Sequence, residues 1–235
     1  MKSPIQFLAA ATIGAAALAA SLFGLNALAA QVSKTGAPST ALEAPVPDGA
    51  QKAADAQGGS MGALWQELEK TPFIREGADD AHAKATIYAF FDPNCIFCHL
   101  AWKLSQPYLK EGLQVRWIPI AFVMPDSAAK AAWLITSPDP ATALNAGESG
   151  WKQGVADGGG AFLKGPVTDE VKARLKANET LFTKLGLDAT PSFVYKDALG
   201  EVKTLPGLSN QHMFTTMTGL PFIPTTDPDL ARVPE

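Results

Sequence analysis

The stretch from Ala85 to Leu104, ATIYAFFDPNCIFCHLAWKL, determines how the rest of the chain is interpreted. Up to Phe91 it is apolar and rich in β-forming side chains, which is typical of a buried strand. From His99 onward its apolar residues have helical spacing. Cys95 and Cys98, the two cysteines of the whole chain, lie at this predicted strand-to-helix junction. Two thiols with no third thiol available for pairing indicate redox chemistry rather than a structural crosslink.

The position of each cysteine suggests its role. A cysteine in the first turn of a helix faces unpaired backbone N–H groups and the positive end of the helix dipole, which stabilise a thiolate. Such cysteines commonly have pKa values of roughly 3.5–7.5. We therefore expect Cys95 to be the attacking nucleophile. Cys98 lies three residues further on and deeper, and is expected to resolve a mixed disulfide by forming a Cys95–Cys98 disulfide.

Structural roles for the two cysteines are weaker interpretations. A disulfide across two residues closes a very small loop and stabilises little. A zinc site needs about four ligands at fixed spacing. The chain offers only His82, His99 and His212 as histidine ligands, and none of them repeats the cysteine pattern. We therefore expect no metal and, for redox chemistry at the thiols, no cofactor.

A haem protein is the alternative from another class. Cys95-Ile-Phe-Cys98-His99 is a C-x-x-C-H sequence, the attachment motif of c-type haem. Met124 or Met213 would then be candidates for the second axial ligand. The strand that runs into the motif argues against this interpretation, but at this point it stays open.

Composition and charge favour one globular domain with appendages. The 235 residues are 47% hydrophobic and 18% charged. The net charge of -4, without a basic block, argues against nucleic acid as a partner.

The N-terminus indicates export to an oxidising compartment such as the periplasm. Residues 1–29 combine Lys2, an apolar run and the small residues Ala27 and Ala29, which together are typical of a cleaved signal peptide. The alternative is an uncleaved membrane anchor, because the apolar run is just long enough to span a bilayer. Residues 30–60 are rich in Ala, Pro and Gly and predict a flexible tether.

The remaining residues predict an α/β domain. A linker helix and loop are expected over 61–84, a catalytic domain over 85–220 and a loosely ordered tail over 221–235. The predicted elements, in chain order, are a helix over 61–70, a strand over 86–91, a helix over 95–110, a strand over 113–120, a helical stretch from about 126 that stops at Pro138, a helix over 168–185, a hairpin of strands 192–196 and 201–205, and a helix over 209–219. The segment from Gly147 to Gly165 is glycine-rich and is left unassigned. The helices between the second strand and the hairpin form an insertion between the two halves of the domain.

A second motif, Ala189-Thr190-Pro191-Ser192-Phe193, precedes the hairpin. A proline directly before an apolar strand marks a strand start or a sharp turn. Together with the Cys-x-x-Cys motif this sequence resembles the thioredoxin superfamily. The resemblance implies a thioredoxin-like fold in which Pro191 is cis and its loop faces the cysteines. It also implies that Thr190 and Pro191 offer a substrate polypeptide a short β-like pairing surface.

The resemblance narrows to the periplasmic DsbG/DsbC group of thiol:disulfide interchange proteins, and within it to DsbG. It is carried by these stretches: Phe91-Asp-Pro-Asn-Cys-Ile-Phe-Cys98 with Trp102 and Pro107, Leu64-Trp65-Gln66, Ser137-Pro-Asp-Pro140 and Gly207-Leu208. It implies an enzyme that reduces or isomerises protein disulfides, or rescues oxidised cysteines, and that a membrane DsbD-type protein keeps reduced. A monomeric DsbA-like thiol oxidase is the enzymatic alternative.

The chain departs from that group in two ways. The group's N-terminal dimerisation domain has no counterpart between the signal peptide and Met61, so we expect a monomer. Between the cysteines, Ile96 and Phe97 offer the thiolate no side-chain hydrogen bond, so we expect a less stabilised thiolate and a less oxidising couple. His99 is expected to be solvated, with electrostatic tuning of the thiols as its functional interpretation.

Overall fold

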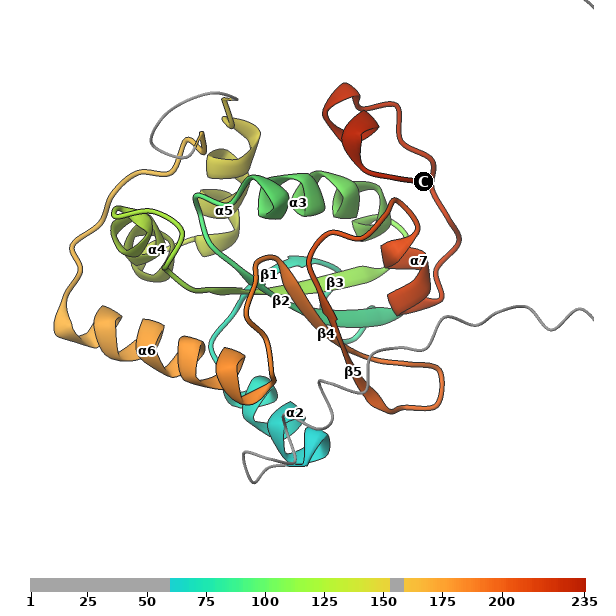
Figure 1. Cartoon of the computed structure of the whole chain (residues 1–235), viewed down its shortest axis with the longest axis horizontal. Coiled ribbons are helices and arrows are strands. Elements are labelled where there is room, and N and C mark those ends of the chain that lie inside the picture. The colour runs from blue at the N-terminus through green and yellow to red at the C-terminus, as the bar shows by residue number, and fades with distance from the viewer. Residues whose placement is uncertain (1–59, 153–158) are drawn as a thin grey trace, which may run out of the picture. The chain divides into compact units, whose positions relative to one another are not determined.

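A five-stranded sheet organises the computed structural model, which describes residues 60–152 and 159–235 (Figure 1). The predicted signal peptide and nearly all of the predicted tether lie outside the described residues. The strand order is β1-β3-β2-β4-β5, and β2 and β3 are parallel while the other pairs are antiparallel. The strands are β1 (Ile74–Gly77), β2 (Ala85–Phe91), β3 (Leu113–Pro119), β4 (Ser192–Lys196) and β5 (Val202–Pro206). In the described ranges, no helix is both long and apolar enough to cross a membrane.

Alternating side chains of the sheet build two separate cores. From β2, Ile87, Ala89 and Phe91 pack with α3 (Ile96–Leu109) and α7 (Met213–Thr218). Tyr88 and Phe90 point the other way and pack with α2 (Met61–Lys70) and α6 (Asp169–Lys184). Figure 1 shows α3 on one side of the sheet and α2 and α6 on the other. The central strand is therefore buried on both faces, which explains why its sequence is apolar throughout.

The helical insertion lies between β3 and β4, as predicted, and consists of α4 (Ser127–Thr136), α5 (Pro140–Ser149) and α6. Our prediction missed α5 because Pro138 was expected to end the helical stretch. Instead a new helix begins at once, since the Asp139 carboxylate accepts a hydrogen bond from the Thr142 N–H at 3.0 Å. Pro140 occupies the first helical position, where its missing N–H is no loss.

The expected linker over 61–84 is part of the packed domain. Leu64 and Leu68 of α2 are buried against the sheet, and Ile74 to Gly77 pairs with β3 as an edge strand. Four residues are too few for an alternating pattern to be recognised in the sequence.

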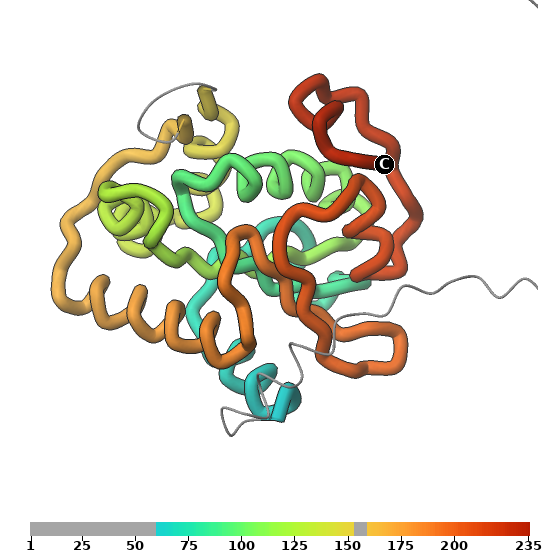
Figure 2. The backbone as a smooth tube through the Cα atoms, in the orientation of Figure 1, coloured from blue at the N-terminus to red at the C-terminus, as the bar shows by residue number. Residues whose placement is uncertain are grey.

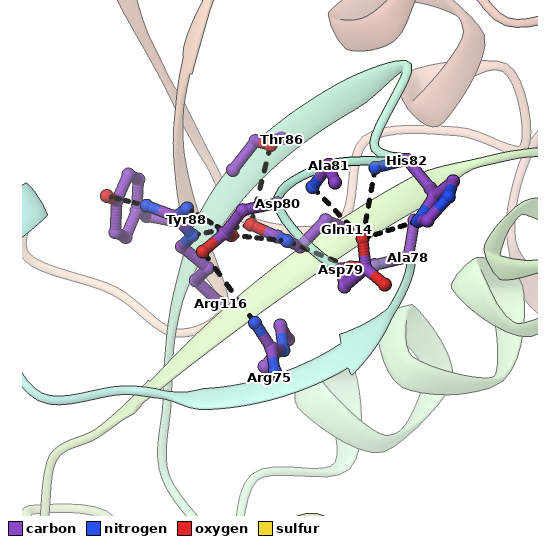
Figure 3. Close-up of polar contacts among 10 residues, drawn as sticks. All are labelled: Arg75, Ala78, Asp79, Asp80, Ala81, His82, Thr86, Tyr88, Gln114 and Arg116. Carbon is purple, nitrogen blue, oxygen red and sulfur yellow. Dashed lines mark hydrogen bonds and ion pairs between the residues drawn. The ribbon is translucent and has the colours of Figure 1, made fainter.

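A polar network joins this edge strand to the middle of the sheet (Figure 3). The Arg116 guanidinium donates hydrogen bonds to the Tyr88 hydroxyl, the Gln114 side-chain oxygen and the Asp80 carboxylate. It also lies over the Phe73 ring, 4.7 Å from its centroid. The network fixes the loop after β1 against β3.

The C-terminal segment is ordered, contrary to the expectation of a loose tail over 221–235. Leu230 and Val233 are buried in the core that contains α3 and α7. Leu230 lies in a short 3-10 helix, η1 (Pro228–Arg232), and Val233 follows it directly. Lys103 of α3 forms ion pairs with Asp227 at 2.8 Å and Asp229 at 2.6 Å. The C-terminal segment of the chain thus packs against α3 (Figure 2). The prolines of this segment suggested a loose tail, and only the tertiary structure shows that Leu230 and Val233 are buried.

Replacing Leu230 tests whether this segment stabilises the domain. Leu230→Ala should lower the free energy of unfolding by about 2–4 kcal/mol, because a buried side chain is removed and a cavity remains. Urea unfolding followed by tryptophan fluorescence measures the change. Leu199→Ala is the matched control, since Leu199 is 84% exposed and should change stability by no more than about 0.5 kcal/mol. Equal stability of the two variants would contradict the proposed anchoring.

Candidate active site

Cys95 is the N-cap residue of α3. Its sulfur accepts a hydrogen bond from the Cys98 backbone N–H at 3.4 Å, and its thiol donates to the Thr190 carbonyl at 3.2 Å. Both cysteines are free thiols here and both are buried, with exposed fractions of 6% for Cys95 and 1% for Cys98. The predicted difference in depth between the two thiols is therefore present, while their disulfide and their separate roles stay predictions.

The surroundings make the two thiols chemically unequal. A hydrogen bond from the Cys98 thiol, assisted by one from the Thr190 side chain and by nearby backbone N–H groups, lowers the pKa of Cys95 to about 7 against the opposing effect of burial. Complete burial raises the pKa of Cys98 well above its ordinary value, and the neighbouring Cys95 sulfur adds to the effect. At neutral pH, Cys95 is consequently the thiol that supplies a thiolate.

The turn before Cys95 is held by buried polar groups. The fully buried Asp92 carboxylate accepts hydrogen bonds from the Phe122 and Val123 backbone N–H groups at 2.8 and 2.9 Å. The Asn94 side-chain oxygen accepts one from the Lys130 ammonium at 2.6 Å. These contacts attach the turn to the loop after β3 and to α4, so the insertion fixes where α3 begins.

The predicted proline loop lies at the thiols. The Thr190–Pro191 peptide bond is cis, which confirms that expectation. The Pro191 carbonyl accepts a hydrogen bond from the Gly207 N–H at 2.7 Å, which joins the loop to the end of β5. The hydrogen bond between the Cys95 thiol and the Thr190 carbonyl joins residues that are 95 positions apart in the sequence.

The two residues between the cysteines differ in exposure. Ile96 is half-buried, whereas the Phe97 side chain is 56% exposed beside Cys95. Their effect on the redox potential stays a prediction.

His99 is buried, contrary to the expectation of a solvated side chain. It is 4% exposed, and its Nδ1 lies 2.9 Å from a carboxylate oxygen of Glu148, which is 1% exposed. The sequence prediction missed Glu148, because nothing in the pattern of α5 distinguishes this residue from a surface acid.

The arrangement of His99 does not fit the haem interpretation. In a C-x-x-C-H site the histidine ligates the iron, but here the His99 ring is stacked against Trp102 and Trp151. Cys98 is also too deeply buried to carry a thioether bond to a macrocycle. Among the residues that the structure describes, no cluster of three or more His, Cys, Asp or Glu side chains has the geometry of a metal site.

A second buried carboxyl group, Glu76 of β1, was also missed. Its two oxygens accept hydrogen bonds from the indole N–H groups of Trp102, at 3.2 Å, and Trp117, at 2.8 Å. Burial raises the pKa of Glu76 to about 7, while the two indole hydrogen bonds act in the opposite direction. Glu76 therefore titrates in the same range as Cys95.

Comparison with known proteins identifies the family. Residues 77–219, which include both cysteines and the cis-proline loop, match the family described as thioredoxin-like domain. The chain belongs to the thioredoxin-like family. This assignment accounts for the sheet order, the position of Cys95 at the start of α3 and the loop that faces it.

Two curated relatives of this thioredoxin-like chain are named thiol:disulfide interchange protein DsbG. The one from Pseudomonas aeruginosa is 31% identical over 66% of this chain and 59% of its own length. The one from Escherichia coli is 30% identical over 66% of this chain and 60% of its own length. The chain thus spans about three-fifths of the length of these relatives.

Solved structures support the thioredoxin-like fold. A periplasmic thioredoxin-like protein from Salmonella enterica serovar Typhimurium has a TM-score of 0.54 at 18% identity, over 66% of this chain and 94% of that chain. The catalytic domain of Proteus mirabilis ScsC has a TM-score of 0.53 at 22% identity, over 73% of this chain and 99% of that chain.

The contribution of Cys98 to thiolate formation can be measured directly. Cys98→Ala should raise the pKa of Cys95 above about 7, because the thiol that donates to its sulfur is removed. Cys98→Ser should cause a smaller rise, since the hydroxyl still donates. Thiolate absorbance and alkylation rate as functions of pH measure both variants, and an unchanged Cys95 pKa in both would refute the assigned cause.

Glu76 makes a separate, pH-dependent contribution to stability. The folded protein binds the Glu76 proton more tightly than the unfolded chain does, so its contribution is present below pH 4.5 and is lost as the pH rises to about 7. The loss amounts to about 3 kcal/mol at most. In Glu76→Gln this part of the pH dependence should disappear from urea unfolding free energies. A variant whose stability changes with pH as in the native chain would argue against the raised pKa.

Proposed function

We propose that this chain is an exported thiol–disulfide oxidoreductase that reduces or isomerises protein disulfides, or rescues oxidised cysteines, in the manner of DsbG. The observation that carries the proposal is the unequal thiol pair, because the Cys95 thiol has a pKa of about 7 and lies beside a Cys98 thiol whose pKa is strongly raised. The names of the two curated relatives support the same activity.

The proposed reaction proceeds through a mixed disulfide. The Cys95 thiolate attacks one sulfur of a substrate disulfide; the Cys95–substrate bond forms, the substrate S–S bond breaks, and the released sulfur takes up a proton. Cys98 then loses its proton and attacks the Cys95 sulfur, which releases the second substrate thiol. The substrate gains two electrons and the chain is left with a Cys95–Cys98 disulfide. In isomerisation, another substrate thiol displaces Cys95 instead and the chain stays reduced.

Substrate binding is proposed at the cis-proline loop. Thr190 already contacts the Cys95 thiol through its carbonyl, so a polypeptide bonded to Cys95 would lie along Thr190 and Pro191. The exposed ring of Phe97 offers such a polypeptide an apolar contact beside the nucleophile. Ile96 and Phe97 provide no side-chain hydrogen bond to the thiolate, and on that ground we expect a couple that is less oxidising than in the related group.

The proposal includes the periplasm as the compartment and a membrane DsbD-type protein as the source of electrons. The sequence of residues 1–29 and the periplasmic source of a similar structure support the compartment. A monomeric state is also part of the proposal.

Trapping the mixed disulfide tests this function. Cys98→Ala should accumulate covalent complexes with exported proteins, because Cys95 still attacks and nothing resolves the bond. Cys95→Ser is the control and should trap none while retaining the fold. A DsbD-type protein among the trapped partners supports a reductase or isomerase, whereas a quinone-linked DsbB-type partner would show that the chain is an oxidase. Absence of any complex would refute the oxidoreductase function.

A further inference from the structure

Large apolar side chains are exposed around the turn that precedes Cys95. Among the described residues, the large hydrophobic side chains that face solvent are Phe97, Phe122, Val123, Leu163 and Leu199. All of them except Leu199 belong to segments that contact this turn or begin α3, and we refer to these four as the apolar rim. Exposed apolar side chains that are scattered singly need no explanation, whereas a group of them marks a contact surface.

The loop after β3 carries two members of the apolar rim. The Asp92 carboxylate accepts hydrogen bonds from the Phe122 and Val123 N–H groups at 2.8 and 2.9 Å. The Asp92 carbonyl accepts another from the Cys95 N–H at 2.9 Å. The Phe122 ring packs against Phe182 of α6, with centroids 6.2 Å apart, and is nevertheless 52% exposed. One buried residue, Asp92, therefore fixes the nucleophile and this loop in relation to each other.

A segment of the insertion carries a third member, Leu163, which is 63% exposed. The backbone just before it lies against the same turn, because a Cβ atom at Gly160 would be 3.2 Å from the Pro93 carbonyl oxygen. The Lys164 ammonium lies 2.9 Å from the Asp126 carboxylate. The charges of this ion pair balance each other, so the pair adds no net charge to the surface beside Leu163.

The nucleophile is recessed relative to the apolar rim. Cys95 is 6% exposed, whereas Phe97, two residues further on, is 56% exposed. A disulfide bond requires the substrate sulfur to come within about 2 Å of the Cys95 sulfur. The residues on either side of the substrate's cysteine are then brought onto the surface around Cys95. The partner that meets the apolar rim is therefore the polypeptide that is bonded to Cys95.

The side chains of the apolar rim favour apolar neighbours of the substrate cysteine. Contact between apolar side chains removes the surface of both partners from water, which is favourable. A charged or amide side chain in the same place would lose water without gaining a hydrogen bond from the side chains of the rim. Selectivity should therefore depend on the sequence around the substrate cysteine.

We propose that the apolar rim selects substrates whose cysteine is flanked by apolar side chains. The proposal rests on the thiol–disulfide function above and adds a substrate class to it. The loop after β3 and the insertion supply three of the four side chains, so elements outside the Cys-x-x-Cys motif determine which polypeptides react.

The test compares two synthetic peptides that each hold one cysteine in a mixed disulfide with glutathione. One peptide has leucine and phenylalanine at the two positions on either side of the cysteine, and the other has serine and asparagine there. The full-length reduced chain should reduce the apolar peptide about tenfold faster than the polar one. Chromatography of the released peptide thiol gives the two second-order rate constants.

Substitutions in the apolar rim should lower this preference. Phe122→Ser and Leu163→Ser should each decrease the ratio of the two rate constants about threefold, because each removes an apolar contact and leaves the backbone hydrogen bonds in place. Since the readout is a ratio between two substrates, a change in the reactivity of Cys95 itself cancels. Thermal unfolding shows whether each variant is folded, and Leu163→Ser decides if Phe122→Ser does not fold.

Leu199→Ser is the matched control. Leu199 is 84% exposed and lies between β4 and β5, so the ratio for this variant should equal that of the native chain. A loss as large as in the rim variants would contradict the proposal, because any exposed apolar side chain would then have the same effect. An unchanged ratio in the folded rim variants would contradict it as well.

The native chain separates failure of this proposal from failure of the proposed function. Equal rate constants for the two peptides would overturn the selectivity of the apolar rim and leave the thiol–disulfide function standing. Reduction of neither peptide would refute that function, and the proposal with it. Light scattering should give a monomer mass. A native dimer that becomes a monomer in Phe122→Ser would overturn the proposal, because a second copy of the chain would then cover the rim.

Discussion

The buried carboxylate of Asp92 is the constraint on which the site depends. One oxygen accepts hydrogen bonds from the backbone N–H groups of Phe122 and Val123, and the other accepts them from the Asn94 N–H and the Ser127 hydroxyl. A buried carboxylate with so many donors holds the turn after β2 and the loop after β3 in a single arrangement. Because Cys95 follows that turn directly, the start of α3 and the position of the nucleophile are set by this group.

The same arrangement determines how the insertion relates to the chemistry. Ser127 and Lys130 belong to α4, so the helix after β3 supports the turn before Cys95 from outside the sheet. Glu148 of α5 contacts α3 about one turn after Cys95, through its hydrogen bond with the His99 ring. The insertion is therefore in contact with α3 at successive positions and does not merely cover one side of the domain.

Much of this organisation could be predicted from residues that are neighbours in the sequence. The apolar run of β2, the N-terminal position of Cys95 and the proline before β4 each have a local pattern, and each is present in the structure. Elements without a local pattern were missed or misjudged. β1 is only 4 residues long, and the C-terminal segment has two buried apolar residues among prolines and polar side chains.

The sequence by itself determined that two thiols lie at a strand-to-helix junction, three residues apart and in a helix N-terminus, because that geometry depends only on adjacent residues. The tertiary structure decided what surrounds them. Thr190 meets Cys95 across 95 positions, and Glu148 meets His99 across 49. Such contacts follow from strand pairing and helix packing, which no local pattern specifies. The burial of His99, the raised pKa of Glu76 and the unequal pKa values of the two thiols arise at that level.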